Sequence, residues 1–478
     1  MLFNSIEFAL FLPIVFLIYW AIGYAHINNP LKLRLQNAFV VLASYVFYGW
    51  WDYRFLILIA FTSLCSWGSG LLIAKSREVR AKSRFWLIAN IVLNLAILAV
   101  FKYYDFFVRE FGTLFGIFTD SLLLKIILPV GISFYTFQAL SYSIDVYRKK
   151  IEPTHDIVAF FAYVAFFPQL VAGPIERATN LLPQFQTIRK FNYDQAVDGM
   201  RQILWGLFKK IVIADNCATY VDQVWATYDT QTGSTLLLAA MLFTFQIYGD
   251  FSGYSDIAIG TAKLFGIKLM RNFNNPYFSR DIAEFWRRWH ISLTTWFRDY
   301  VYIPLGGSRV GKWKIVRNTF VIFLLSGFWH GANWTFIAWG AYHAVLFLPL
   351  ILLGKNRQYT GNDVTWQDIP KILLTFCLVV IGWIIFRAET ITQAWEIFGR
   401  ICNSSILSIP WFESAKTILP IPFILAHVIL IEWFNRDKQH GLAIESLNPL
   451  ARWGLYIYIC LLIIAFGAQP ETFIYFQF

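Results

Sequence analysis

The sequence predicts an all-α integral membrane protein, and its composition supplies the main observations behind that prediction. Apolar residues make up 58% of the 478 residues and charged residues only 14%, whereas a water-soluble chain carries about 25% charged residues to solvate its surface. Aromatic residues reach 19%, which suits a lipid-facing exterior with interfacial belts. This composition excludes a disordered chain, a coiled coil, a small disulfide-stapled domain and a cytosolic enzyme.

Apolar stretches recur along the whole chain. A helix needs about 20 mostly apolar residues to cross the hydrocarbon core. Candidate crossings lie at 6–24, 36–51, 54–74, 85–107, 122–146, 157–175, 313–329, 333–353, 371–386, 418–434 and 452–468. No fixed repeat and no Gly/Ser- or Pro-rich linker divides the chain, so we expect a single domain over 1–478. With the middle region added, this predicts a polytopic bundle of about 11–12 transmembrane helices.

The region between about 176 and 270 differs from the rest, because charged residues stand inside its apolar runs. These residues are Arg201, Lys209, Lys210, Asp250 and Asp256. Irregular backbone at membrane depth persists only where it is buried in protein or lines a wet cavity. We therefore expect broken or re-entrant helices in this region, and a site near them.

Basic residues gather in alternate loops, near 32–34, 75–84 and 148–150, and again near 355–371 and 436–452. The segment 271–317 carries nine Arg or Lys against three Asp or Glu. Cytoplasmic loops of membrane proteins collect Lys and Arg, so we expect these segments inside and both termini outside. The same rule accounts for the net charge of +11, and no nucleic-acid partner is expected.

The most unusual stretch reads Phe-Trp-Arg-Arg-Trp-His-Ile-Ser-Leu-Thr-Thr-Trp-Phe-Arg, over residues 285–298. If it forms one helix, the apolar side chains that share one face are Phe285, Trp289, Leu293 and Trp296, and the arginines on other faces are Arg287, Arg288 and Arg298. One interpretation is a plain interfacial anchor. The other is a donor-binding site, because arginine forks bind phosphate bidentately.

A second motif, over residues 326–335, places His330 at the end of an apolar run. Such a histidine is most often a packed core residue. Gly327 and Gly331 allow backbone or substrate to approach it closely, and Asn333 offers a polar partner. A neutral histidine in a dry pocket suits general-base work near pH 7.

The third motif is Gly-Asp-Phe-Ser-Gly-Tyr-Ser-Asp over residues 249–256, which holds Asp250, Ser252 and Asp256. The two carboxylates could cap a broken helix or pair with nearby arginines. No complementary ligand set accompanies them, and the five cysteines lie far apart without a Cys/His cluster. We therefore expect no metal site.

Taken together, these motifs resemble the membrane-bound O-acyltransferase family. The resemblance rests on the run 285–309 and on Trp329-His330-Gly331, with further support from 128–135, 167–174, 250–256 and 473–478. It is closest to the bacterial branch that contains the membrane subunits of alginate and peptidoglycan O-acetyltransferases, and it runs nearly end to end.

The resemblance implies a bundle whose funnels from each side meet at His330 in a central tunnel. It ties catalysis most firmly to His330, and it carries a second histidine over to His290. It also implies acetyl-CoA as a cytosolic donor, with no bound cofactor, in the bacterial inner membrane. The acetyl group would pass outward to a periplasmic partner protein that completes O-acetylation of a polysaccharide, either peptidoglycan or alginate.

The leading hypothesis is acetyl transfer with His330 as general base. Arg287, Arg288 and Arg298 would hold the donor phosphates, and the residues expected to support the site are Trp329, Asn333, Asp250, Ser252 and Asp256. One alternative is another acyl transfer, such as D-alanylation. A second is a transporter or flippase, although no second copy of the 285–343 pattern is present. Beyond acetyl-CoA, the polysaccharide and the protein partner, only membrane lipid is expected to bind.

Overall fold

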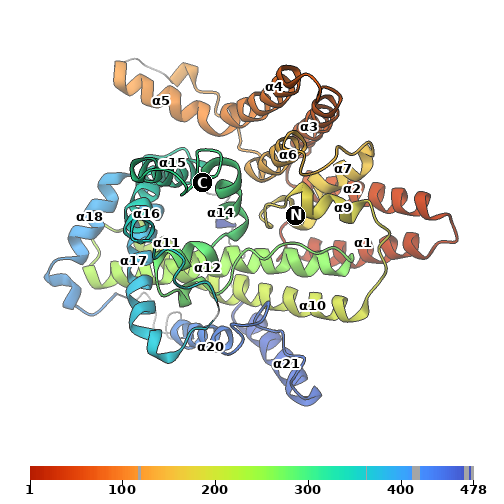
Figure 1. Cartoon of the computed structure of the whole chain (residues 1–478). Coiled ribbons are helices and arrows are strands. Elements are labelled where there is room, and N and C mark those ends of the chain that lie inside the picture. The colour runs from red at the N-terminus through yellow and green to blue at the C-terminus, as the bar shows by residue number, and fades with distance from the viewer. Residues whose placement is uncertain (117–119, 362, 412–419, 468–472, 475–478) are drawn as a thin grey trace. The chain divides into compact units, whose positions relative to one another are not determined.

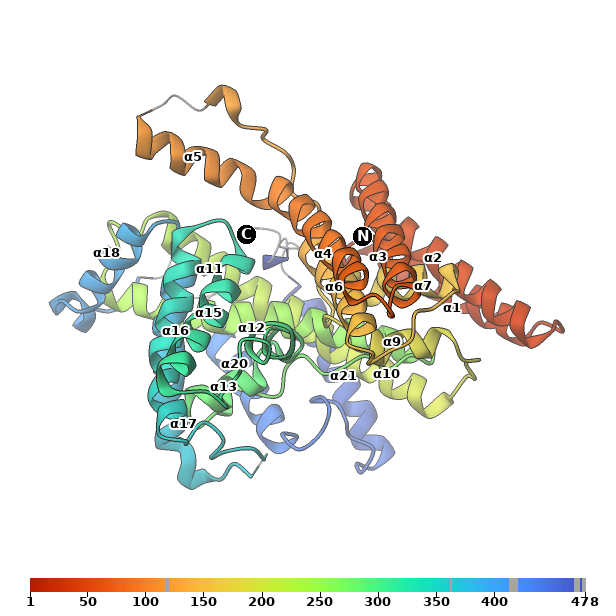
Figure 2. The same ribbon diagram turned by 45° about the horizontal axis from the view of Figure 1, so that its top comes forward.

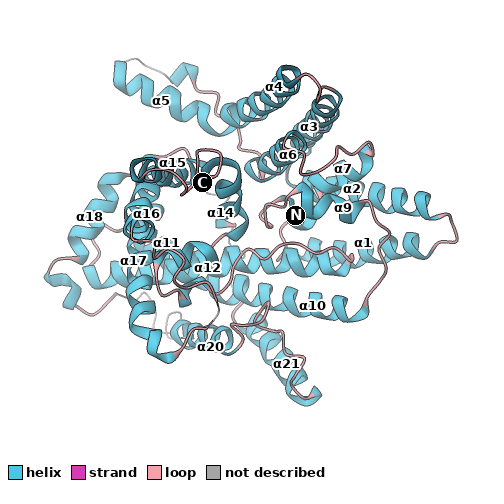
Figure 3. Cartoon of the chain, viewed as in Figure 1, coloured by secondary structure: helices cyan, strands magenta, loops and turns pink. Residues whose placement is uncertain are grey.

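All regular secondary structure in the described chain is helical (Figure 3). The computed structural model describes residues 1–116, 120–361, 363–411, 420–467 and 473–474. Within these ranges there are α-helices, short 3₁₀-helices and three π-helical turns, and no strand. The prediction of an all-α fold is therefore confirmed.

Six helical segments of the described chain are long and apolar enough to cross a membrane. They are α1 (Ile6–Tyr24), Asn29–Lys75, Arg80–Phe115, α12 (Gly233–Leu264), α16 (Trp334–Leu352) and Trp366–Arg387. Two shorter apolar helices follow, α20 (Pro420–Phe434) and α21 (Pro449–Ala465). These segments confirm a multi-pass membrane protein, while the count of about 11–12 crossings stays a prediction.

The contacts divide the chain into two compact units, and the prediction of one domain over 1–478 stays a prediction. The first unit comprises Met1–Met200 and Ala258–Met270, and the second Arg201–Ile257 and Arg271–Phe478. Two helices, α10 (Tyr193–Leu207) and α12, run through the boundary in sequence.

The first unit is built around α2 (Asn29–Asp52) and α3 (Leu56–Lys75), drawn in red to orange in Figure 1. Helix α2 packs against α1 and α7, and α3 packs against α4 and α6. The remaining elements are η1 (Tyr53–Phe55), α4 (Arg80–Leu98), η2 (Ala99–Tyr103), α5 (Tyr104–Phe115), η3 (Asp120–Leu122), α6 (Ile132–Tyr147), α7 (Ile157–Ala165), α8 (Phe167–Leu170) and α9 (Ala178–Phe185).

Two stretches expected as crossings are shorter helices in the structure. In 122–146 the helix begins only at Ile132, because Pro129 and the left-handed Gly131 (φ 73°) precede it. The stretch 157–175 breaks at Phe166 into α7 and α8, and a proline occupies the first turn of α8. Apolar composition alone did not indicate these breaks.

The second unit holds α15 (Lys312–His330), α16 and α17 (Ile369–Arg387), which pack in sequence order (Figure 2). A Cβ added at Gly327 would lie 2.1 Å from the carbonyl oxygen of Phe336, and one added at Gly340 would lie 2.3 Å from that of Phe323. The glycines therefore admit neighbouring backbone. The other elements are η4 (Phe208–Ala214), α11 (Asp215–Ala226), η5 (Pro276–Phe278), α13 (Ile282–Arg288), α14 (Ile291–Phe297), η6 (Arg298–Tyr302), η7 (Trp366–Asp368), α18 (Ile391–Ile401) and η8 (Ser404–Leu407).

The prediction that charges break the helices of the middle region is only partly correct. Helix α12 continues without interruption for 32 residues through Asp250 and Asp256. The irregular backbone lies instead at η4, a seven-residue π-helical segment that contains Lys209 and Lys210. The buried lysines supply partners for the carboxylates of α12, so that helix needs no break.

Candidate active site

The arginine- and tryptophan-rich stretch is not one helix, contrary to expectation. Helix α13 ends at Arg288, Trp289 adopts extended backbone, and α14 starts after His290. His290 has φ 43° and ψ 54°, a left-handed conformation that is uncommon for residues other than glycine. The chain therefore turns sharply at the histidine itself.

The break also redirects the aromatic rings. Phe285 and Trp289 are buried, and their rings stack at a centroid distance of 5.6 Å. Trp289 also lies 4.9 Å from the ring of Trp383 on α17. The rings thus face the protein core.

The imidazole of His290 lies in a fully enclosed setting. Phe251 of α12 meets it edge to face at a centroid distance of 4.6 Å. Its Nδ1 lies 3.0 Å from Oδ1 of Asn272. Burial lowers the pKa of His290 from its ordinary 6.5 to about 3, so the ring is neutral at physiological pH.

His330 ends α15 and is 4% exposed. Three rings surround it: Trp329 at 5.1 Å, Trp339 at 5.2 Å and Phe386 at 5.4 Å between centroids. Trp329 also lies 6.0 Å from the ring of His290. The two predicted histidines therefore both lie beside the ring of Trp329.

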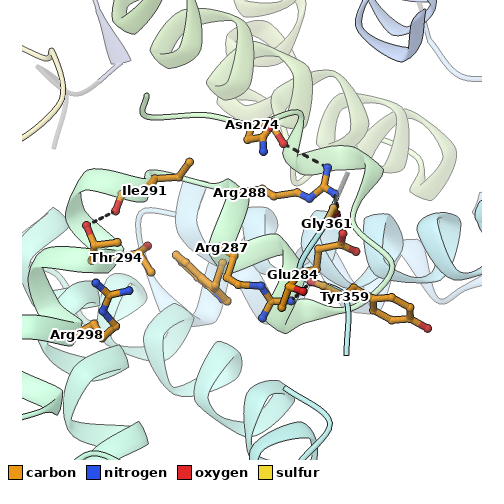
Figure 4. A pocket seen from close by; sticks show the side chains of 12 residues that line it. Asn274, Glu284, Arg287, Arg288, Ile291, Thr294, Arg298, Tyr359 and Gly361 are labelled. Atoms are coloured by element: carbon orange, nitrogen blue, oxygen red, sulfur yellow. Dashed lines mark hydrogen bonds and ion pairs between the residues drawn. The ribbon is translucent and has the colours of Figure 1, made fainter. Parts of the chain in front are cut away.

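A cavity of about 360 Å³ opens beside the break, within the size range of small-molecule sites (Figure 4). All three arginines predicted to bind the donor line it. The lining residues are Asn274, Glu284, Trp286, Arg287, Arg288, Ile291, Thr294, Thr295, Arg298, Tyr359, Thr360 and Gly361. The cavity lining therefore includes the residues on either side of the break, Arg288 before it and Ile291 after it.

Two of the three arginines also hold the loop at 354–361. Arg287 donates to the carbonyl oxygens of Asn356 and Tyr359, both at 2.5 Å. Arg288 donates to Glu284 at 2.7 Å and to the carbonyl oxygen of Gly361 at 3.1 Å. Burial lowers the pKa of both guanidinium groups, but arginine stays charged at neutral pH.

Arg298 is the more accessible member of the set. Its side chain is 57% exposed and pairs with the adjacent Asp299 at 2.7 Å. A surface pair of this kind contributes little to stability, so an incoming anion can compete for the guanidinium.

The residues predicted to support the site divide into two groups. Trp329 contacts both histidines, as described above. Asn333 instead caps α16 by accepting from the Thr335 amide at 3.0 Å, and donates to the carbonyl oxygen of Glu389 at 2.8 Å. Its amide therefore has a structural role at the start of α16.

The polar side chains of the third motif contact lysines. The sequence had left pairing with nearby arginines open as an alternative for Asp250 and Asp256. Lys209 donates to Asp256 at 2.6 Å and to Ser252 at 2.8 Å. Lys210 lies 2.9 Å from Asp250, which also accepts from the backbone amide of Ile474 at 2.7 Å. The motif therefore joins α12 to η4 through ion pairs.

Sequence reasoning missed Asn272 and the loop at 354–361. Asn272 is fully buried and contacts His290 directly. A cluster of three asparagines within four residues, at 272, 274 and 275, was the available signal. The loop carried no comparable signal. The arginines bind its backbone carbonyl oxygens, which every residue type has, so the side chains of the loop do not indicate the contact.

Comparison with protein families gives one match, to "MBOAT, membrane-bound O-acyltransferase family", over residues 148–386. That range contains both histidines, the cavity and Asn272. The match covers the described site in full.

Comparison with individual proteins points the same way. The chain is 44% identical over 458 residues to a "Probable alginate O-acetylase AlgI" of Pseudomonas aeruginosa, covering 94% of this chain and 84% of that protein. It is 37% identical to a "Peptidoglycan O-acetyltransferase" of Helicobacter pylori, covering 83% and 79%. It is 32% identical to a "Teichoic acid D-alanyltransferase" of Bacillus subtilis, covering 54% and 69%. The chain belongs to the membrane-bound O-acyltransferase family and is an acyltransferase.

Proposed function

We propose that the chain transfers acetyl groups from acetyl-CoA toward a cell-envelope polysaccharide, either alginate or peptidoglycan. The relatives named for O-acetylation of these polymers match 94% and 83% of the chain, whereas the D-alanyltransferase matches 54%. That difference favours O-acetylation over D-alanylation. Membership of a transferase family favours transfer over the transporter alternative.

The observation that carries the proposal is the chain break at His290. Arg288 and Ile291, before and after the break, line the arginine-rich cavity. His290, within the break, lies beside the ring of Trp329, which also contacts His330. A donor held in the cavity would therefore be next in sequence to His290, and Trp329 connects His290 to His330.

In this mechanism His330 acts as the general base. It removes the proton from an acceptor hydroxyl, whose oxygen attacks the carbonyl carbon of the thioester. The tetrahedral intermediate collapses with loss of the thiolate, which receives the proton back from His330. A positioned base accelerates such a step by roughly 10²–10⁴-fold, and exclusion of water by the surrounding rings prevents hydrolysis of the thioester.

The arginines would bind the charged part of acetyl-CoA. Arg298 is the group most available to a phosphate, because its own side chain is 57% exposed and it pairs only with the adjacent carboxylate of Asp299 among the contacts described above. Arg287 and Arg288 give the cavity positive charge while they hold its loop. Charge-assisted contacts to phosphate are roughly twice as strong as neutral hydrogen bonds.

Acetyl transfer would proceed outward, with the donor in the cytoplasm and a periplasmic partner protein that delivers acetyl groups to the polysaccharide. This arrangement requires the 271–317 segment inside and both termini outside, in the inner membrane. Single cysteines at exposed Ser308 and Lys82 should be protected from an impermeant maleimide on intact cells, and one at Asn4 should react. Reaction at Ser308 from outside would contradict the assignment.

Reconstitution tests the reaction itself. The purified protein in lipid nanodiscs should transfer radiolabelled acetyl from acetyl-CoA to an alginate or peptidoglycan fragment when the periplasmic proteins of the source cell are added. A D-alanyl thioester should not replace acetyl-CoA. Transfer of D-alanine, or acetyl transfer that is unchanged in His330→Ala, would overturn the proposal.

A further inference from the structure

Asn272 contacts His290 directly, and the mechanism above does not use it. It is fully buried, in the segment between α12 and α13. Its Oδ1 lies 3.0 Å from Nδ1 of His290, 2.9 Å from Oγ of Ser292 and 3.3 Å from the backbone nitrogen of Ser292. One side-chain oxygen therefore serves three neighbours around the break.

The backbone amide of Ser292 determines which atom of the Asn272 amide is the oxygen. A backbone N–H can only donate, so the atom facing it must be an acceptor. The other end of the amide is satisfied in this orientation, because Nδ2 donates to the hydroxyl of Ser255 on α12 at 3.2 Å. A hydroxyl can also donate, so the orientation of the Asn272 side chain follows from the Ser292 amide.

This orientation has a consequence for the imidazole. A carbonyl oxygen accepts hydrogen bonds and never donates them, so Nδ1 of His290 must carry the hydrogen that it shares with Oδ1. In a neutral ring the lone pair then belongs to Nε2. We propose that Asn272 is a positioning residue that holds His290 as the Nδ1–H tautomer and so makes Nε2 the nitrogen that accepts a proton or hydrogen bond during acyl transfer.

The same residue builds the turn on which the histidine sits. The first amides of a helix lack intrahelical partners, and His290, which precedes α14, supplies no side-chain cap. Asn272 replaces that cap from outside the helix: its backbone oxygen accepts from the Ile291 amide at 2.8 Å, and its Oδ1 accepts from the Ser292 amide. The left-handed backbone at His290 and the direction of its ring are thus fixed by one partner.

The role in the reaction rests on the proposed function, because it assumes that His290 acts in transfer. An acceptor hydroxyl, or the hydroxyl of a reaction intermediate, would donate to Nε2. With the opposite tautomer, Nε2 would present a hydrogen to that hydroxyl and could not accept a hydrogen bond from it. Loss of the partner that orients a metal-binding histidine costs roughly 10–100-fold, and we expect a loss of the same order at His290.

The tautomer can be observed without any turnover. The full-length protein in nanodiscs, labelled with ¹³C,¹⁵N-histidine, should show for His290 a protonated Nδ1 and an unprotonated Nε2, assigned by the signal lost in His290→Gln. Asn272→Leu, close in size but without acceptor or donor, should lose this pattern. An Nε2–H tautomer in the wild type would overturn the proposal even if the protein transfers acetyl groups. If His290 has the Nδ1–H tautomer but the protein does not transfer acetyl groups, the proposal about Asn272 is retained and the proposed function is contradicted.

Kinetics separate positioning from a merely structural role. Asn272→Leu should lower kcat by about 10–100-fold with little change in the KM for the donor. Asn272→Asp keeps the acceptor that faces His290 and Ser292, and it puts a second acceptor in place of the Nδ2 donor, to which the Ser255 hydroxyl can donate. This variant should therefore recover most of that loss. Its anion should also move the acid limb of the pH–rate profile to higher pH, because a nearby negative charge favours the imidazolium.

Asn275→Gly is the matched control. It removes an asparagine amide from the same segment and suits the positive φ of 45° found there, so activity should stay within about threefold of wild type. If both Asn272 variants lower only the yield of folded protein, with kcat and pH profile unchanged in the folded fraction, the residue is structural and the proposal is wrong.

Discussion

The chain break at His290 and the contact between η4 and α12 both contain polar residues that stand within apolar sequence. The two regions differ in what those polar residues contact. At the break, a left-handed histidine lies among rings and beside an open cavity. At η4, two buried lysines meet carboxylates of α12. In the first region the arrangement leaves room for a ligand, and in the second the protein's own groups bind one another.

The comparison shows that a charge inside an apolar run does not by itself mark a site. Lys209 and Lys210 are 3% and 4% exposed, and each carries a carboxylate partner within 3 Å. Breaking such a pair is costly, and replacing it by well-packed apolar groups is often neutral. The first region should therefore govern activity and the second stability, and the experiments below can break or sharpen that division.

The largest effect is expected at the histidine pair. His330→Ala should lower acetyl transfer by roughly 10²–10⁴-fold, because it removes the proposed base. Folded yield and thermal midpoint in detergent should change little in comparison. His427→Ala, which removes a histidine from α20, should retain activity within about twofold. Near-normal transfer by a folded His330→Ala protein would remove the histidine pair from the chemistry.

The second region should respond through stability. Lys209→Met leaves the Asp256 carboxylate, whose side chain is 14% exposed, without its cation, and we expect a loss of about 3 kcal/mol in unfolding free energy. The double variant Lys209→Met/Asp256→Leu should recover most of that loss. Thermal unfolding of both proteins measures the difference. A double variant that is stable but inactive would show that the ion pair serves the reaction after all.

A smaller effect is expected for the donor cavity. Arg298→Glu should raise the KM for acetyl-CoA by about tenfold, with a lesser change for the acceptor, because one charge-assisted phosphate contact contributes about 1.5–3 kcal/mol. Arg309→Glu changes the same charge at an exposed position outside the cavity lining and serves as the control. Equal KM changes in both variants would mean that only the overall charge of the segment matters.

The smallest effect concerns acid stability. The pKa of His290 is about 3 in the folded protein and about 6.5 when exposed, so the unfolded state binds more protons between these values. Stability from the neutral ring is therefore fully present above about pH 6.5 and is lost as the pH falls toward 3. At pH 5 the difference is about 2 kcal/mol. His290→Gln should flatten the pH dependence of the thermal midpoint between pH 7 and 5, and an unchanged slope would contradict the burial of a neutral imidazole.

Much of the fold followed from hydropathy alone. The stretches 6–24, 313–329, 333–353 and 371–386 correspond closely to α1, α15, α16 and α17. Hydropathy did not indicate where a helix breaks, as at Phe166 or at Trp289, because the breaking residues are themselves apolar or aromatic. The turn at His290 depends on Asn272, which is 18 residues away, and such a distant cap cannot be inferred from local sequence.

Part of the candidate site could also be predicted from the sequence. Residue type and position singled out His330 and the arginines, and the family resemblance added His290; the structure places the histidines beside Trp329 and the arginines around the cavity. Not all of the positive charge in the segment 271–317 indicates which side of the membrane it faces. Arg280 and Arg288 belong to the basic segment 271–317, yet they are buried and paired with Glu284, so part of its positive charge is structural and does not bear on sidedness.

The π-helical turn at η4 places a limit on how the length of this chain can vary. Such a turn corresponds to one residue added to an α-helix. Deleting a single residue from Phe208–Ala214 would restore the regular helix and rotate the residues on one side of the deletion by about 100° relative to those on the other. Lys210 pairs both with Asp250 on α12 and with Asp215, which follows the turn, so a deletion between Lys210 and Asp215 would rotate these two partners relative to each other. A loop can gain or lose residues with little cost, but a change in the length of this turn would disturb a buried ion-pair network.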